Sequence, residues 1–294
     1  MILSQIHLPE SYNYIACFLT LDCNLKCGYC INSFGAGNKF KIPLMPGRSW
    51  IEGMNRLVCH ENLPVTIQGG EPGLHPDFIS IIKNIKEDLN IDILTNLSFN
   101  VDDFIKELKP SRLNRNAPYP NIRASYHPSH TDLNDFINRV AKIQRAGFSI
   151  GVFVILHPQF QQEITELKKR CLDLGIDCRT KEFLGEFNGK MHGAYLYPEA
   201  VGDTKRKKCL CRTSELIIGP DGNVFRCHHD LYKNFPPVGN LLEPDFKIND
   251  IFRECAQFGD CNPCDIKIKT NRFQVYGHTS VEIKDIGSVY CERG

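Results

Sequence analysis

The sequence YIACFLTLDCNLKCGYC, residues 14–30, joins an apolar strand to a loop that carries Cys23, Cys27 and Cys30. Residues 14–20 form the kind of short apolar run that predicts a buried strand. Three thiolates separated by three residues and then by two can bind one small cluster, and cysteine thiolates at such spacings hold iron–sulfur clusters. Three ligands leave one iron of a four-iron cluster open. The alternative is a zinc site of three cysteines and a histidine, although no histidine lies in the loop.

Strand-like and helix-like segments alternate from about residue 13 to residue 185. Such alternation predicts a parallel α/β sheet with helices outside it, and in a barrel-like arrangement the active site lies at the C-terminal ends of the strands. We expect strands at 14–20, 64–68, 91–97, 121–127, 149–157 and 177–183, and helices at 49–59, 75–89, 101–108, 132–146 and 159–174.

The second expected strand ends in the loop Gly69-Gly70-Glu71-Pro72. Glycines let a backbone approach a ligand closely, and a carboxylate can accept from an ammonium group. Together with the cysteine loop, in which Tyr29 fills the aromatic position, this loop resembles the signature of the radical S-adenosylmethionine (radical SAM) superfamily. The resemblance covers about residues 13–185 and implies an incomplete (β/α)6 radical SAM barrel, with the glycine-rich loop holding the methionine amino group of SAM.

The resemblance also implies a reaction. A [4Fe-4S] cluster on the three cysteines of the first loop binds SAM through its open iron. One electron then cleaves SAM to methionine and a 5′-deoxyadenosyl radical, which abstracts hydrogen from an unreactive C–H bond. Asn96, after Thr95 at the end of the third strand, and Ser125, at the end of the fourth, are expected to contact SAM. Each is equally consistent with a polar residue that satisfies its own backbone.

Four residues are candidates for contact with substrate: His127, His157, Lys181 and Glu182. Both histidines follow strands and precede prolines, where they face the cavity as acid, base or donor, or merely shape a loop. Lys181 and Glu182 alternate along the sixth strand, so one of them should point inward.

A second group of cysteines fills the last third of the chain: Cys209, Cys211, Cys227, Cys255, Cys261, Cys264 and Cys291. We expect a linker from FNGKMHG to the basic run 205–208, and then a hairpin of 215–218 and 224–226. Gly222 lies in the hairpin turn, where a positive φ is expected. The hairpin returns Cys227 beside Cys209 or Cys211. Cys261 and Cys264 form a tight two-ligand knuckle.

This second group resembles the SPASM and twitch auxiliary-cluster extensions of radical SAM enzymes. Their first half is a cysteine, nine to fifteen residues, a glycine, four residues and a cysteine, and both Cys209 and Cys211 satisfy this count with Cys227. The full SPASM pattern is incomplete, which favours one auxiliary [4Fe-4S] cluster over two. A zinc site remains an alternative because His228 and His229 follow Cys227. The resemblance divides the chain into a core at 1–190 and an auxiliary-cluster domain at 191–294.

Composition excludes several function classes. The 294 residues are 42% apolar and 23% charged, and 35 basic residues against 34 acidic ones give no reason to expect a nucleic-acid or membrane surface. No apolar run approaches the roughly 18 residues of a membrane span, and no signal peptide is evident, so we expect a cytoplasmic protein. Fourteen cysteines in a reducing compartment indicate metal binding.

The expected function is oxidoreductase-type radical SAM chemistry, with a reductant such as flavodoxin or ferredoxin as partner. The substrate is a small polar metabolite, such as a sugar, nucleotide or amino-acid derivative, or else a peptide. Only 22 residues precede Cys23, which mildly favours the small molecule over a peptide that needs a leader-binding domain. A non-catalytic zinc or electron-transfer protein is the third alternative.

Overall fold

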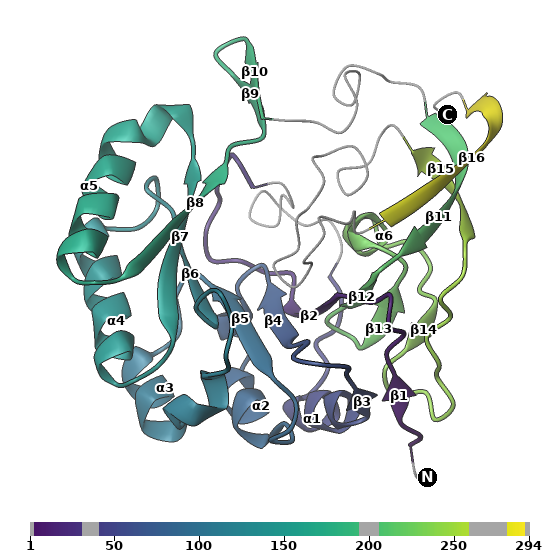
Figure 1. Cartoon of the computed structure of the whole chain (residues 1–294), viewed down its shortest axis with the longest axis horizontal. Coiled ribbons are helices and arrows are strands. Elements are labelled where there is room, and N and C mark those ends of the chain that lie inside the picture. Colours follow the sequence, from purple (N-terminus) through teal and green to yellow (C-terminus); the bar gives the residue numbers. More distant parts are fainter. Residues whose placement is uncertain (1–2, 31–40, 194–205, 259–280, 292–294) are drawn as a thin grey trace.

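The computed structural model describes residues 3–30, 41–193, 206–258 and 281–291. Its centre is a nine-stranded sheet in the order β14-β13-β12-β2-β4-β5-β6-β7-β8, with helices α1–α5 along one face (Figure 1). The six strands from β2 to β8 are all parallel, so the expected incomplete (β/α)6 barrel is confirmed. They are β2 (Tyr14–Thr20), β4 (Val65–Gly69), β5 (Ile91–Thr95), β6 (Ile122–Tyr126), β7 (Ile150–Leu156) and β8 (Asp177–Glu182). The helices are α1 (Gly47–Asn55), α2 (Phe78–Asn84), α3 (Val101–Glu107), α4 (Leu133–Arg145) and α5 (Gln161–Asp173).

Alternation along each strand separates two faces of the sheet. In β6, Ile122, Ala124 and Tyr126 belong to the main hydrophobic core. Arg123 and Ser125 lie between them in sequence and therefore project to the opposite, inner face. The helices bury the apolar face, which leaves the polar residues of the strands directed toward the inside of the barrel.

The C-terminal hairpin extends the same sheet. β12 (Glu215–Ile218) pairs in parallel with β2, with Leu216 opposite Ile15, and β13 (Asn223–Phe225) and β14 (Gly239–Asn240) follow at the edge. Gly222 has φ +81° in the turn, as expected for this hairpin. The expected division at residue 190 stays a prediction, and the parts on either side of it share this sheet.

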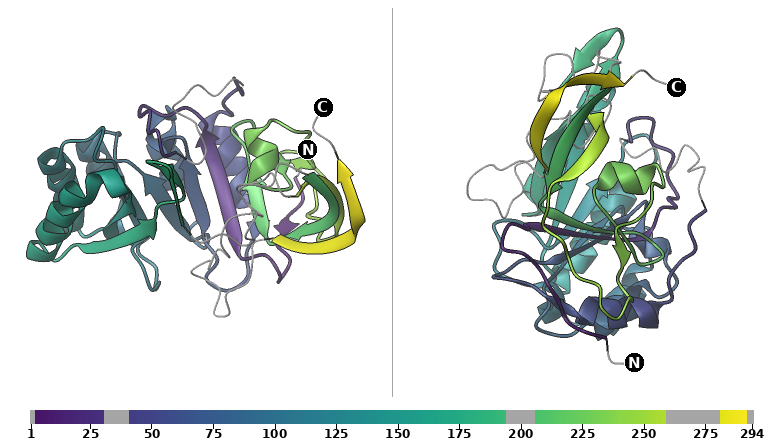
Figure 2. Two further views of the ribbon diagram at one scale, coloured as in Figure 1. Left: turned by 90° about the horizontal axis from the view of Figure 1, so that it is seen from above. Right: turned by 90° about the vertical axis from the view of Figure 1, so that its right-hand side faces the viewer.

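A second, three-stranded sheet places β11 (Arg206–Thr213) between β15 (Arg253–Phe258) and β16 (Val281–Cys291), all antiparallel. It lies beside the β12–β14 end of the main sheet (Figure 2). The expectation of a linker at the basic run is wrong for residues 206–208, which begin β11.

FNGKMHG is also not a linker. It completes a hairpin, because it holds the last residue of β9 (Gly185–Phe187), the turn and the whole of β10 (Lys190–His192). Asn188 and Gly189 turn the chain with φ +51° and +72°, a conformation that these two residue types tolerate best.

Two helices are shorter than expected. α1 ends at Asn55 because the next residues, β3 (Leu57–Val58), pair with β1 (Ile6–His7). α2 ends at Asn84, where the Arg112 guanidinium binds carbonyl groups of its last turn and of the residues that follow. Arg112 donates to the carbonyl oxygens of Ile82, Ile85, Lys86 and Leu89. Within the described ranges, no helix is long and apolar enough to cross a membrane.

Arg56 connects the barrel to the segment that follows β14. Its buried guanidinium donates to the carbonyl oxygens of Ser4 (2.7 Å), Pro244 (3.1 Å) and Leu241. These carbonyls come from two segments far apart in the sequence, so one side chain holds both segments beside α1.

We predict that Arg56→Met lowers the free energy of unfolding by about 2 to 4 kcal/mol, because three carbonyls lose a charged donor. Urea denaturation measures the change. The exposed Arg48, on helix α1 just before Arg56, supplies the control, and Arg48→Met should change stability by less than about 0.5 kcal/mol. Equal effects of the two substitutions would contradict the role of Arg56.

Candidate active site

The first three cysteines lie in the loop that follows β2, and all three are half-buried. The Leu25 amide donates to Cys23 Sγ over 3.4 Å, and the Cys30 amide donates to the Cys27 carbonyl over 3.1 Å. The pKa of Cys27 is raised to about 11, chiefly by burial and in part by the charges of Cys30 and Cys23.

The Gly-Gly-Glu-Pro loop packs directly on the beginning of the cysteine loop. Gly70 N–H donates to the Thr20 carbonyl over 3.0 Å, and Glu71 N–H donates to the Asp22 carbonyl over 2.9 Å. A Cβ atom at Gly69 would lie 2.1 Å from the Thr20 oxygen, and one at Gly70 would lie 2.1 Å from the Asp22 oxygen. The glycines are thus required for contact between the two loops, a reason that the motif alone did not show.

Glu71 joins the same loop to the end of β5. Its side chain is 1% exposed and accepts from Thr95 Oγ1 (2.6 Å), the Asn96 amide (2.6 Å) and the Gly73 amide (3.0 Å). Burial raises the pKa of Glu71 to about 7, and these hydrogen bonds oppose the increase. Glu71 therefore fastens β4 to β5, a structural task beside the expected contact with SAM, which stays a prediction.

Asn96 and Ser125 lie at the strand ends where they were expected. Asn96 Nδ2 donates to Asn24 Oδ1 over 3.0 Å, which links the end of β5 to the cysteine loop. Ser125 faces inward from β6, in register with Phe153 of β7. Sequence reasoning missed Asn24, because only its position between Cys23 and Cys27 distinguishes it from other asparagines.

His127 lies against the cysteine loop. Its Nδ1 is 3.4 Å from Cys27 Sγ and 3.2 Å from the Tyr29 hydroxyl, and its ring stacks on Tyr29 at 6.1 Å. Burial, with help from His130, lowers the pKa of His127 to about 4, so the ring is neutral at pH 7. The cysteine loop contains no histidine, but His127 from the end of β6 lies beside it in the folded chain.

His157 has the loop-shaping role considered for it, and its contact with substrate stays a prediction. Its Nδ1 accepts from the Gln159 amide over 3.2 Å and so shapes the loop after β7. Its ring also packs among aromatic side chains. The ring centroids lie 4.3 Å from Phe183, 5.1 Å from Phe187, 5.2 Å from Phe160 and 5.3 Å from Tyr29.

Lys181 is the inward residue of the pair on β8. It is in register with Ile155, and its ammonium lies 5.8 Å from the centre of the inward Phe153 ring. Glu182 alternates to the other face. Of the two candidates, only Lys181 is on the face where substrate is expected.

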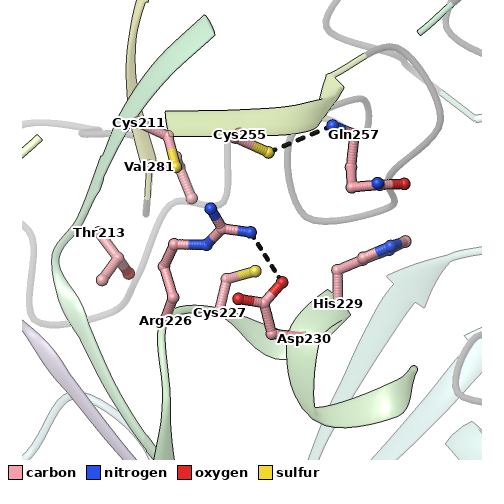
Figure 3. A pocket seen from close by; sticks show the side chains of 9 residues that line it. All are labelled: Cys211, Thr213, Arg226, Cys227, His229, Asp230, Cys255, Gln257 and Val281. Carbon is pink, nitrogen blue, oxygen red and sulfur yellow. Dashed lines mark hydrogen bonds and ion pairs between the residues drawn. The ribbon is translucent and has the colours of Figure 1, made fainter. Parts of the chain in front are cut away.

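Three of the later cysteines line one pocket. Cys211 from β11, Cys255 from β15 and Cys227 at the start of α6 (His228–Tyr232) surround it (Figure 3). Cys209 is opposite Cys255 in the β11–β15 register, so Cys209, Cys211 and Cys255 share one face of that sheet. A hydrogen bond from the Cys211 thiol lowers the pKa of Cys255 to about 6, and the Arg226 cation adds to the decrease.

Arg226 reaches into the same pocket, between the thiols (Figure 3). It donates to Asp230 Oδ1 (2.9 Å) and the Glu254 carbonyl (2.6 Å), whereas its buried Nε has no hydrogen-bond partner. A buried N–H without an acceptor is costly. Anionic sulfur in the pocket would supply the missing acceptor.

The two histidines after Cys227 point to different places. His228 turns away to Glu215, with Nδ1 3.1 Å from Oε2, whereas His229 lines the pocket. Cys261 and Cys264 lie outside the described residues. Within the described ranges, no three Cys, His, Asp or Glu side chains meet at metal-binding distance, so these thiols line the pocket without enclosing a common centre.

Comparison with known proteins agrees with this geometry. Residues 18–171, more than half of the chain, match the model of the radical SAM superfamily. The chain belongs to the radical SAM superfamily.

Curated relatives of this radical SAM protein are named GTP 3′,8-cyclase. The protein of Alkaliphilus metalliredigens is 28% identical over 204 residues, which are 65% of this chain and 63% of that protein. The protein of Campylobacter jejuni subsp. doylei is 31% identical over 106 residues, which are 35% of this chain and 33% of that protein. The match thus spans between one third and just under two thirds of the relatives' lengths.

Solved structures share the fold at lower identity. Streptococcus suis SuiB bound to S-adenosylmethionine has a TM-score of 0.54 and 16% identity, over 79% of this chain and 64% of that one. The enzyme anSMEcpe with bound AdoMet and the Kp18Cys peptide has a TM-score of 0.53 and 14% identity, over 79% of this chain and 78% of that one.

Radical SAM enzymes use a [4Fe-4S] cluster and SAM, and the residues of this chain fit that requirement. Three half-buried thiols share one short loop, and an amide already donates to one of the sulfur atoms. Thiolate ligands with N–H donors to sulfur are the usual environment of such clusters. The chain is therefore an enzyme of the radical SAM type, and Cys23, Cys27 and Cys30 are its candidate cluster ligands.

Glu71 should make stability depend on pH. A carboxyl whose pKa rises from 4.5 to about 7 on folding binds more protons in the folded state between these values. The free energy of unfolding should therefore fall as the pH rises from about 4.5 to 7, and the Glu71 contribution should be constant above that. We expect Glu71→Gln to abolish this part of the dependence, as measured by urea denaturation from pH 4.5 to 8.

The exposed Glu87 gives the control, because Glu87→Gln should retain the wild-type pH profile. A Glu71→Gln profile parallel to the wild-type profile would show that Glu71 does not titrate in this range.

Proposed function

We propose that this protein reductively cleaves SAM at the Cys23, Cys27 and Cys30 site and abstracts hydrogen from a small polar substrate, with a second cluster assisting the oxidation. One observation carries the proposal: the cysteine loop, the Gly-Gly-Glu-Pro loop and the end of β5 are joined by direct hydrogen bonds. The two signatures of the superfamily thus form one site. A [4Fe-4S] cluster with SAM supplies the radical chemistry when both are bound.

The residues of the chain then have distinct tasks. Glu71 and Asn96 fix the loops that receive SAM, and the expected SAM contacts are Tyr29, Gly69–Pro72, Asn96 and Ser125. Tyr29 and His127 pack beside Cys27 and keep solvent from it. Lys181, beside the Phe153 ring, and His157, beside the Phe183 ring, are the candidates for contact with the substrate.

The second cluster is supported by the Cys211, Cys227 and Cys255 pocket. The orphan Nε of Arg226 there fits an anionic metal–thiolate centre. Cys209, on the same face, Cys261 and Cys264 are further candidate ligands. A reductant such as flavodoxin or ferredoxin would supply electrons.

The substrate proposal follows the sequence relatives. Those at 26–31% identity are named GTP 3′,8-cyclase, an activity on a nucleotide, which supports a small polar substrate. The second candidate is a peptide, which the anSMEcpe and SuiB structures with bound peptides favour. Measuring 5′-deoxyadenosine formation with GTP and with short peptides compares the two. Stimulation by peptides alone would overturn the small-molecule proposal.

We predict that the Cys23→Ala, Cys27→Ala, Cys30→Ala triple variant produces no 5′-deoxyadenosine from SAM with dithionite, because no thiolate remains to hold iron. Chromatography of the anaerobic reaction measures the product. Cys59→Ala, at a half-buried cysteine that packs against the core, is the control and should retain the activity. Product formation by the triple variant would refute the site.

We also predict about eight irons per reconstituted chain, as two four-iron clusters. Cys211→Ala with Cys255→Ala should remove about half of them while SAM cleavage without substrate stays measurable, because the first loop is untouched. Iron analysis gives the count, and a far-UV spectrum confirms that the variant is folded. A folded double variant with all its iron would exclude these two cysteines as ligands.

A further inference from the structure

The inner face of the sheet carries a cation whose carboxylate partner is already occupied. Asp92, on β5, is completely buried and accepts four hydrogen bonds: two from Arg115, one from the Tyr119 hydroxyl and one from Asn121 Nδ2. A carboxylate offers about four acceptor positions, so Asp92 is saturated. Arg123, on the neighbouring β6, reaches Asp92 only as an ion pair at 3.5 Å.

Arg123 therefore contributes a surplus buried charge. The residue is 8% exposed, and its Nε and Nη2 atoms have no hydrogen-bond partner. The other described carboxylates of this face are engaged elsewhere: Asp177 by Arg179 and Glu215 by His228. Burying a cation without its own counter-charge is expensive. Arg115 and Arg123 share the single negative charge of Asp92, so a bound anion would neutralise the remaining positive charge.

A second unused donor lies in the same row of the sheet. Arg123 is opposite Leu94 in the pairing of β5 with β6. In the pairing of β4 with β5, Ile67 is opposite Ile93, so the next residue, Gln68, is also opposite Leu94. Gln68 and Arg123 therefore lie at the same level of the sheet, on either side of Leu94. Gln68 Oε1 accepts from the Tyr14 hydroxyl over 3.2 Å, which leaves its buried Nε2 without an acceptor. Gln68 and Arg123 are two strands, roughly 10 Å, apart along the sheet, and both are long side chains.

We propose that Gln68 and Arg123 bind an anionic, acceptor-rich group of the substrate, a carboxylate or a phosphate. This inference rests on the proposed function. The next inward residue of β6 beyond Arg123 is Ser125, the candidate SAM contact, which lies two residues or roughly 6.6 Å along the strand. The anion thus binds one layer beneath the strand ends that receive SAM. Its attachment there places the adjoining C–H bonds of the substrate between the anchor and SAM.

The test uses the anaerobically reconstituted enzyme with SAM and without reductant, titrated calorimetrically with inorganic phosphate and, separately, with acetate. The wild type should bind one phosphate or one acetate per chain, and the tighter of the two identifies the group. Arg123→Met should weaken that binding by about tenfold or more, because the charged donor is lost. Arg123→Lys should retain part of the affinity, and Gln68→Leu should have a smaller effect than Arg123→Met.

Arg145→Met, at an exposed arginine of α4, is the control and should bind as the wild type does. Wild-type affinity in Arg123→Met, or no binding of either anion by the wild type, would overturn the inference. Far-UV spectra confirm folding, and if Arg123→Met unfolds, the comparison rests on Arg123→Lys and Gln68→Leu.

Formation of 5′-deoxyadenosine without substrate separates the two proposals. If the wild type forms no 5′-deoxyadenosine, the proposed function itself is wrong. If it forms 5′-deoxyadenosine but binds anions no better than Arg123→Met does, only this inference is wrong.

Discussion

Two backbone hydrogen bonds hold the catalytic end of this molecule together: Gly70 N–H to the Thr20 carbonyl and Glu71 N–H to the Asp22 carbonyl. They form because Gly69 and Gly70 have no Cβ atom, which would lie 2.1 Å from a carbonyl oxygen at either position. This close approach fixes where the cysteine loop leaves β2. The Glu71 carboxylate then extends the connection to β5, so three consecutive strand ends behave as one unit.

The same sheet serves two purposes because its residues alternate. The outer face is apolar and packs on the helices, whereas the inner face carries charged side chains, among them Arg123, whose ion-pair partner Asp92 already accepts four hydrogen bonds. We propose that residues at the strand ends bind SAM and that Gln68 and Arg123, further inside the barrel, bind the substrate. The pocket of later cysteines lies between a separate sheet, formed by β11, β15 and β16, and helix α6, which follows β13 of the main sheet. Radical generation and the proposed electron transfer are thus built on different elements.

The sequence predicts what depends on local patterns. Residues 14–30 and 69–72 carry the cysteine spacing, the glycines and the strand within short windows, and the structure confirms the strands and the hairpin around Gly222. Helix ends were predicted less well, because α2 stops where the distant Arg112 takes its carbonyls. The basic run at 206–208 resembles a linker, yet it starts β11 because β15 and β16 pair with it on both sides. The sequence analysis did not single out Arg123 within the strand at 121–127, because the four hydrogen bonds that occupy Asp92 come from residues distant in sequence and are seen only in the folded chain.

The central claim is that the loop of Cys23, Cys27 and Cys30 holds a cluster to which SAM binds directly. The electron paramagnetic resonance spectrum of the reconstituted, dithionite-reduced Cys211→Ala, Cys255→Ala variant, recorded with and without SAM, tests it most directly, because the signal of the proposed second cluster is removed. We predict a four-iron cluster signal whose shape changes when SAM is added. A cluster signal that SAM leaves unchanged, or a protein that binds zinc and no iron, would contradict the account.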